Sequence, residues 1–121
     1  MHKVNFGNVT TITEFIYNAD DNGDNEVGGE LNFSALTSLE KVNLSFSKLN
    51  SLDFINTLPN SIIAIGCPRN DFYQMELPTT FPTLTNLALI NISNSGIKGT
   101  IPNLSHLTSL KTLQLEGNTT N

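Results

Sequence analysis

The densest group of side chains that could hold a metal ion lies in the segment 20–30, which reads DDNGDNEVGGE. The D-x-N-x-D spacing that begins at Asp20 is that of the first half of a calcium-binding loop, in which hard oxygen ligands surround a hard cation. Such a loop needs Gly at its sixth position and a bidentate Glu at its twelfth, where this chain has Asn25 and Leu31. We therefore interpret the segment as an acidic, solvated turn, and we predict no metal site and no cofactor.

Side chains that could catalyse a reaction are sparse. The two histidines are His2, near the start of the chain, and His106, which has no acid or thiol beside it in the sequence. Cys67 is the only cysteine, so no intrachain disulfide can form. The chain also lacks a glycine-rich phosphate loop, a metal-spaced pair of histidines and a Gly-x-Ser-x-Gly motif. We therefore predict that the protein is not an enzyme.

The charge and composition of the chain argue against two classes of partner. The formal net charge is -5, and the six Lys and Arg residues are scattered, so no basic stripe is available to neutralise a phosphate backbone. The chain has no apolar run long enough for a membrane helix, and its first residues lack the apolar run of a signal peptide. We expect no nucleic-acid partner and no membrane insertion.

The cellular compartment stays open. Six Asn-x-Ser/Thr sequons, in a chain with seventeen Asn, suit a glycosylated ectodomain but can also arise by chance. The protein would be extracellular if this chain is a fragment of a larger ectodomain, and cytoplasmic otherwise. The sequons begin at Asn8, Asn32, Asn43, Asn91, Asn103 and Asn118.

The strongest pattern in the sequence is a repeat with apolar residues in the spacing L-x-x-L-x-x-L-x-L. Clear copies begin at Leu36, Leu84 and Leu107, and a degenerate copy runs from Ile62 to Cys67. In each copy the last three residues alternate apolar, polar or small, apolar, which predicts one short, half-buried strand per repeat. A single turn of this size cannot close a core, so neighbouring repeats must stack to cover each other. Cys67 takes a Leu or Ile position, which favours a packing thiol over a reactive one.

At the residues Ile97-Lys98-Gly99-Thr100-Ile101-Pro102, the sequence resembles the plant-type leucine-rich repeat, which ends Leu-x-Gly-x-Ile-Pro. A looser version runs from Phe72 to Pro78, and the resemblance covers about residues 35–121. It implies an α/β fold: a right-handed solenoid with a short parallel β-sheet on its concave face. In that family one polar position per repeat is usually Asn, whose amide bonds to backbone groups of neighbouring coils. The equivalent residues here recur every 23 to 25 positions, at Ser47, Asn70, Ser95 and Asn118.

The two ends of the chain depart from the repeat. We interpret residues 1–34 as an atypical N-terminal cap. Thr11-x-x-Glu14 resembles a capping box and predicts a short helix over about 12–18, whereas the alternation through Phe15 and Tyr17 leaves a strand open. Residues 35–121 hold about four repeats, and the last one stops without a capping segment. We expect either a fragment of a longer array or self-association through that open end.

The concave face is where we expect binding, because rigid stacked strands present many side chains without an ordering cost. Our first hypothesis is a recognition module for a protein partner of unknown identity. The alternatives are a structural or self-assembling segment of a larger protein, a carbohydrate-binding module, and an ordinary solvated sheet. The candidate ligand-binding residues are Lys41, Asn43, Ser45, Phe46, Arg69, Leu89, Asn91, Ser93, Asn94, Thr112, Gln114 and Glu116.

Overall fold

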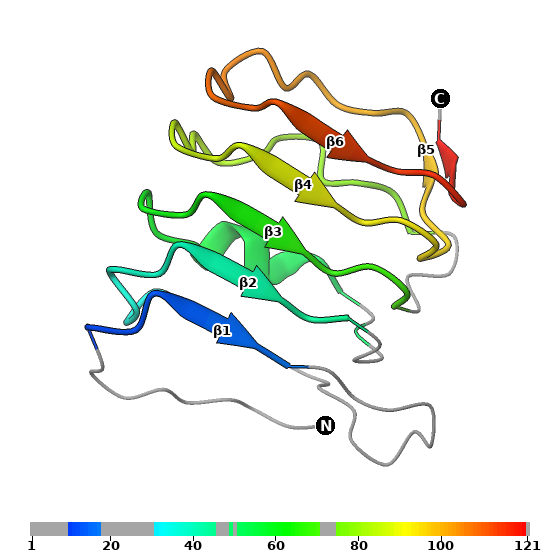
Figure 1. Ribbon diagram of the computed structural model, residues 1–121. Coiled ribbons are helices and arrows are strands. Elements are labelled where there is room, and N and C mark those ends of the chain that lie inside the picture. Colours follow the sequence, from blue (N-terminus) through cyan, green and yellow to red (C-terminus); the bar gives the residue numbers. More distant parts are fainter. Residues whose placement is uncertain (1–9, 18–30, 46–48, 50, 71–74, 121) are drawn as a thin grey trace.

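The computed structural model describes residues 10–17, 31–45, 49, 51–70 and 75–120 of the chain (Figure 1). Five short strands form one parallel sheet in the order β1-β2-β3-β4-β6. Because each strand lies parallel to its neighbour, the chain returns to the same end of the sheet before every new strand, and the described residues form a β-solenoid. The strands are β1 (Glu14–Ile16), β2 (Lys41–Asn43), β3 (Ala64–Gly66), β4 (Leu89–Asn91) and β6 (Thr112–Gln114).

The predicted register of the repeat is present in this sheet. The middle residues of the strands are aligned across it, from Phe15 through Val42, Ile65 and Ile90 to Leu113. Their side chains turn toward the interior, while the residues on either side of them turn outward, as the period of two along a strand requires. In the four repeats, the first apolar residue of each alternating triplet lies at the centre of its strand, and the second lies just after the strand ends.

The helical part of the expected α/β fold was wrong for the described residues. Their one helix is the short 3-10 helix η1 (Asp53–Thr57), and the other segments that return between strands are turns and extended chain. Proline accounts for part of this difference, since it removes a backbone donor and biases the preceding residue toward extended conformations. The return segments contain Pro59, Pro78, Pro82 and Pro102.

The segment predicted as a helix over 12–18 contains strand β1 instead. The backbone oxygen of Thr13 accepts hydrogen bonds from the amides of Glu40 and Lys41, at 2.8 and 3.0 Å, which ties β1 to the edge of β2. Phe15 packs edge-on against the ring of Phe33, with centroids 5.4 Å apart. Burial of Phe15 and the closing of an otherwise unpaired edge outweighed the local capping signal, so the strand alternative is confirmed for Glu14–Ile16.

A second, two-stranded parallel sheet lies on the return path of the coil. β5 (Lys98–Gly99) pairs with β7 (Thr119–Thr120), and Figure 1 shows the pair beyond the carboxyl ends of the main strands. Gly99 has a φ of 89°, a conformation that favours glycine, whereas the nearest atom that a Cβ would meet, Oε1 of Glu76 at 2.7 Å, ends a flexible exposed side chain that can move aside. The Gly of the I-x-G-x-I-P segment is therefore explained by local geometry.

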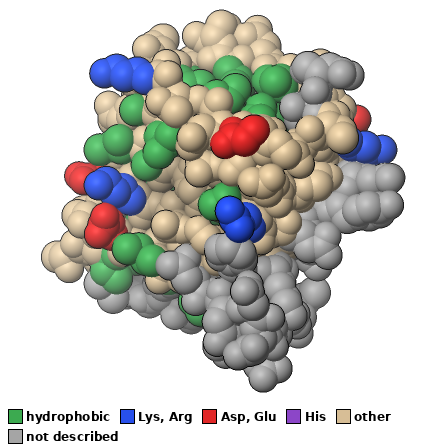
Figure 2. All heavy atoms as spheres, turned by 45° about the vertical axis from the view of Figure 1, so that its right-hand side comes forward, with side chains coloured by type: hydrophobic (Ala, Val, Ile, Leu, Met, Phe, Trp, Pro, Cys, Tyr) green, Lys and Arg blue, Asp and Glu red, His purple; other side chains and the backbone are tan. Residues whose placement is uncertain are grey.

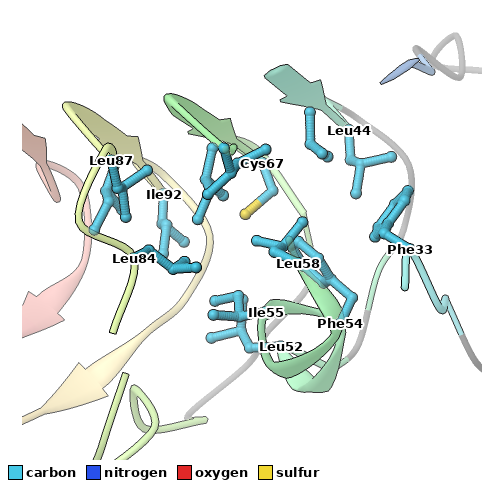
Figure 3. Close-up of a cluster of buried hydrophobic side chains, with 14 of the residues drawn as sticks. Phe33, Leu44, Leu52, Phe54, Ile55, Leu58, Cys67, Leu84, Leu87 and Ile92 are labelled. Carbon is cyan, nitrogen blue, oxygen red and sulfur yellow. The ribbon is translucent and has the colours of Figure 1, made fainter. Parts of the chain in front are cut away.

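The core lies between the sheet and the return segments. Figure 3 shows Leu44, Cys67 and Ile92 entering it from the strand side, and Phe54 and Ile55 entering it from η1. Leu44, Cys67, Ile92 and Ile55 are all fully buried. At the outer strand the burial is lower, since Leu113 is 38% exposed.

The expected amide-to-backbone bonds are present at Asn70 and Asn118. Nδ2 of Asn70 donates to the backbone oxygen of Leu44 at 2.8 Å, and its Oδ1 accepts from the amide of Leu49 at 3.0 Å. Asn118 makes the same bonds to the coil that precedes it. Each Asn thus fastens its own coil to the previous one through groups that would otherwise be buried without a partner. Ser47 lies outside the described residues.

Candidate functional site

Six of the predicted binding residues lie on β2, β4 and β6 and face the same way, with β3 between β2 and β4. We call the side of the five-stranded sheet that points away from the core the sheet face. Lys41 and Asn43 on β2 and Thr112 on β6 are exposed there, whereas Leu89, Asn91 and Gln114 are half-buried. The register aligns these residues in two rows across the sheet.

The residues that follow the strands form the border of the sheet face. Arg69, Asn94 and Gly117 occupy equivalent places in three coils, and all have positive φ, at 58°, 54° and 79°. Arg69 and Asn94 are exposed, as is Glu116, and Ser45 is half-buried. This backbone conformation turns the chain away from the sheet and places the side chains at its edge.

One member of the predicted site is buried, and another lies outside the described residues. Ser93 is only 7% exposed, so the prediction that it lines the binding face needs correction. Its amide and its Oγ both donate to Oδ1 of Asn91, at 3.1 and 2.8 Å, which makes it a support for that residue. Phe46 lies outside the described residues.

Strand β1 adds two residues to the sheet face that the sequence did not assign to the site. Ile16 is 60% exposed, the largest exposure among the large apolar side chains described. Glu14 lies 3.8 Å from Nζ of Lys41, but both side chains are about half exposed, so solvent screens this ion pair. The signal that could have found them is the alternation around Phe15, whose burial turns residues 14 and 16 outward.

The centre of the sheet face is a shallow trough of about 330 Å³. Its floor is the small residues of one coil: Ala64 and Gly66 on β3 and Pro68 just after it. Its walls include Asn43 on β2 and Leu89 on β4, which carry longer side chains. The lining also includes Glu14 and Lys41, whose charged groups lie 3.8 Å apart, and Figure 2 shows side chains of both charges next to one another at one edge of the view. The trough is therefore a hollow with an apolar floor and one pair of opposite charges at its border.

Two amides with fixed orientation border the trough. Oδ1 of Asn43 accepts hydrogen bonds from the amide and the Oγ of Ser45, at 3.2 and 2.6 Å. Asn91 makes the same pair of bonds with Ser93. Because Oδ1 of each amide faces its serine, Nδ2 of the same amide points away from that serine. Within the described residues, neither Nδ2 donates a hydrogen bond to another protein group.

The register places Asn43 and Asn91 on either side of Gly66, one strand away in each direction. Two strand spacings separate them by about 9–10 Å. The trough thus has an apolar floor that a ligand group can cover, between two sets of N–H donors that can bind oxygen acceptors.

Reactive chemistry is sparse among the described residues. They contain no group of three or more His, Cys, Asp or Glu side chains that could hold a metal ion. Nε2 of His106 lies 2.8 Å from the backbone oxygen of Phe81, a structural contact. Burial raises the pKa of the Cys67 thiol to about 12, which keeps it protonated. The acidic segment 20–30 and His2 lie outside the described residues.

Within the described part of the chain, no helix is long and apolar enough to cross a membrane. A scan against protein-family models and searches of curated proteins and of solved structures found no match to this chain.

Proposed function

We propose that the chain is a non-catalytic leucine-rich-repeat recognition module that binds a protein partner through the concave face of its sheet. The observation that carries this proposal is the trough over Ala64, Gly66 and Pro68, with the oriented amides of Asn43 and Asn91 at its borders. The assignment to the plant-type repeat is supported by Asn-mediated bonds between coils and by the positive φ of the glycine in the I-x-G-x-I-P segment.

The trough has the features of an anchor point for a partner's side chain. An apolar side chain that covers Ala64 and Gly66 would displace water from a concave apolar surface, with Leu89 as one wall. Backbone or side-chain oxygens beside it would accept hydrogen bonds from Nδ2 of Asn43 and Asn91. Because Ser45 and Ser93 already hold these amides, little rotamer entropy is lost when they bind.

The test is a comparison of two variants of the full chain. Ala64→Arg places a long charged side chain on the floor of the trough, whereas Thr79→Arg adds the same group at an exposed residue on the return path. Wild type and both variants are immobilised separately and cross-linked to proteins of the source cells. The proteins that each one captures are quantified by mass spectrometry. We expect at least one protein to be lost more than tenfold with Ala64→Arg and retained with Thr79→Arg.

Equal capture by both variants would overturn the proposal, because no protein partner would then depend on the trough. The same two variants are applied to a glycan array. Glycan binding that only Ala64→Arg abolishes, without any such protein, would support the carbohydrate-binding alternative in its place.

A further inference from the structure

A second row of side chains crosses the solenoid at the amino ends of the strands. Glu40, Ile63, Ala88 and Lys111 each come immediately before a strand, namely β2, β3, β4 and β6. The amide of Ile63 donates to the oxygen of Glu40, that of Ala88 to Ile63, and that of Lys111 to Ala88, at 2.7, 2.8 and 2.9 Å. These bonds hold the four residues side by side, one per coil, and we call them the rim row.

The rim row lies in a groove of about 610 Å³. No residue that lines this groove lines the trough of the sheet face. Ile63 is 38% exposed, one of three large apolar side chains that the described residues leave open to solvent. Glu40 and Lys111 are exposed, and within the described residues neither makes an ion pair. The groove therefore offers apolar contact and two charges of opposite sign.

The order of the rim row makes it complementary to its own reverse. From one end to the other it reads acidic, large apolar, small apolar, basic. When the row is reversed, Glu40 stands opposite Lys111, and Ile63 stands opposite Ala88. The two charges cannot satisfy each other within one molecule, because three strand spacings separate their backbones by about 14 Å.

We propose that the rim row is an isologous interface through which two copies of this chain form a dimer. In such an interface the same patch serves both subunits, so residue i contacts j and j contacts i. A two-fold axis that lies in the interface plane, perpendicular to the row and between β3 and β4, superimposes each row on the reverse of the other. It pairs Glu40 of each copy with Lys111 of the second copy.

The same axis places Ile63 of each copy against Ala88 of the other. The dimer thus has two Ile63–Ala88 contacts at the centre of the interface. The two ion pairs lie at the periphery of the interface. Rim charges act mainly on the choice and orientation of the partner, whereas the apolar centre supplies most of the contact. Because the trough is not involved, the dimer leaves the sheet face open for the partner proposed above.

The experiment measures the molar mass of the full chain by light scattering across a concentration series at low salt. We expect a dimer whose dissociation constant rises at least tenfold in Glu40→Lys and in Lys111→Glu. Each of these reversals places side chains of like charge opposite one another at both ends of the interface. The double variant that carries both changes restores the opposite pairing, and we expect its dissociation constant within about threefold of the wild-type value. Asp53→Lys, a charge reversal at an exposed residue of η1 that lines neither the groove nor the trough, should leave the dimer unchanged.

Three results would overturn the proposal. The first is a chain that remains monomeric at the highest soluble concentration. The second is a double variant no better than the single ones, which would remove the charge pairing from the explanation. The third is a dimer that ignores all rim-row variants but is broken by Leu113→Lys, which would move the contact to the edge of β6. Circular dichroism spectra of the variants establish that each is folded, and none of these results bears on the trough.

Discussion

The substitution Asn70→Ala tests whether the amide bonds between coils are essential to the fold. Asn70 is 7% exposed, and its side chain binds two backbone groups of the preceding coil, the oxygen of Leu44 and the amide of Leu49, at 2.8 and 3.0 Å. Alanine leaves both groups buried without these partners, and each such group costs about 1–3 kcal/mol. We therefore expect the free energy of unfolding to fall by about 2–6 kcal/mol, a large part of a typical domain's stability.

The matched control for this prediction is Asn118→Ala. Asn118 makes the same bonds to its preceding coil, but it is only half-buried, so water can reach the groups that lose their partner. We therefore expect Asn118→Ala to lower the free energy of unfolding by about 1 kcal/mol. Urea unfolding followed by circular dichroism measures both values. A change under about 0.5 kcal/mol for Asn70→Ala, or an equal loss in the two variants, would refute the reasoning.

Four further changes have outcomes that follow from single positions. Ile92→Ala removes a fully buried side chain, and denaturant melts should show a loss of about 2–5 kcal/mol. Gly117→Ala should destabilise by at least about 1 kcal/mol in the same melts, because its φ is 79° and a Cβ would collide with Oδ1 of Asn94. Burial raises the pKa of Cys67 from 9.0 to about 12, so the folded chain keeps a proton that the unfolded chain releases. The contribution of this pKa shift to the free energy of unfolding should be fully present below pH 9 and should be lost as the pH rises toward 12. Cys67→Val should remove this part of the pH dependence in melts at each pH. Gly66→Ala should stabilise by about 0.5–1 kcal/mol, measured the same way, because glycine is unfavourable inside a strand.

The positions of the strands in the repeats could be predicted because one physical constraint recurs at fixed spacing. Val42, Ile65, Ile90 and Leu113 each had to face the core, and the alternation around each one identified the strand. The form of the return segments could not be predicted in the same way. Turns, a 3-10 helix and an α-helix can all bring the chain back over such a distance, and the resemblance to a known repeat favoured the wrong one.

The sequence predicted which strand residues face the candidate site, but it did not predict the shape of that surface. The alternation correctly placed Lys41, Asn43 and Leu89 on the outward side of the sheet. It could not show that Ser93 binds beneath Asn91, because that depends on a turn after the strand. The trough depends on side-chain sizes in adjacent coils, which become neighbours only once the register is known.

The rim row shows the same limit more clearly. Glu40, Ile63, Ala88 and Lys111 share no residue type, so no motif search connects them. They become one surface because parallel strands with a constant offset bring equivalent positions together. In a solenoid, positions that face outward carry little core energy, and their identity is therefore free to serve contacts with other molecules.

Gly66 is the residue for which this separation of fold and function can be argued most directly. The nearest atom that a Cβ there would meet is the backbone oxygen of Val42, at 3.7 Å, an ordinary contact. Neither a positive φ nor a close approach therefore requires glycine here, whereas Gly99 and Gly117 both have a positive φ. The fold does not need glycine at this position, and glycine inside a strand weakens the sheet. Its presence is explained if a partner's side chain occupies the space above it. Gly66→Ala would then raise the free energy of unfolding and make the trough shallower. The same change that stabilises the fold should therefore lower the affinity of the sheet face for its partner.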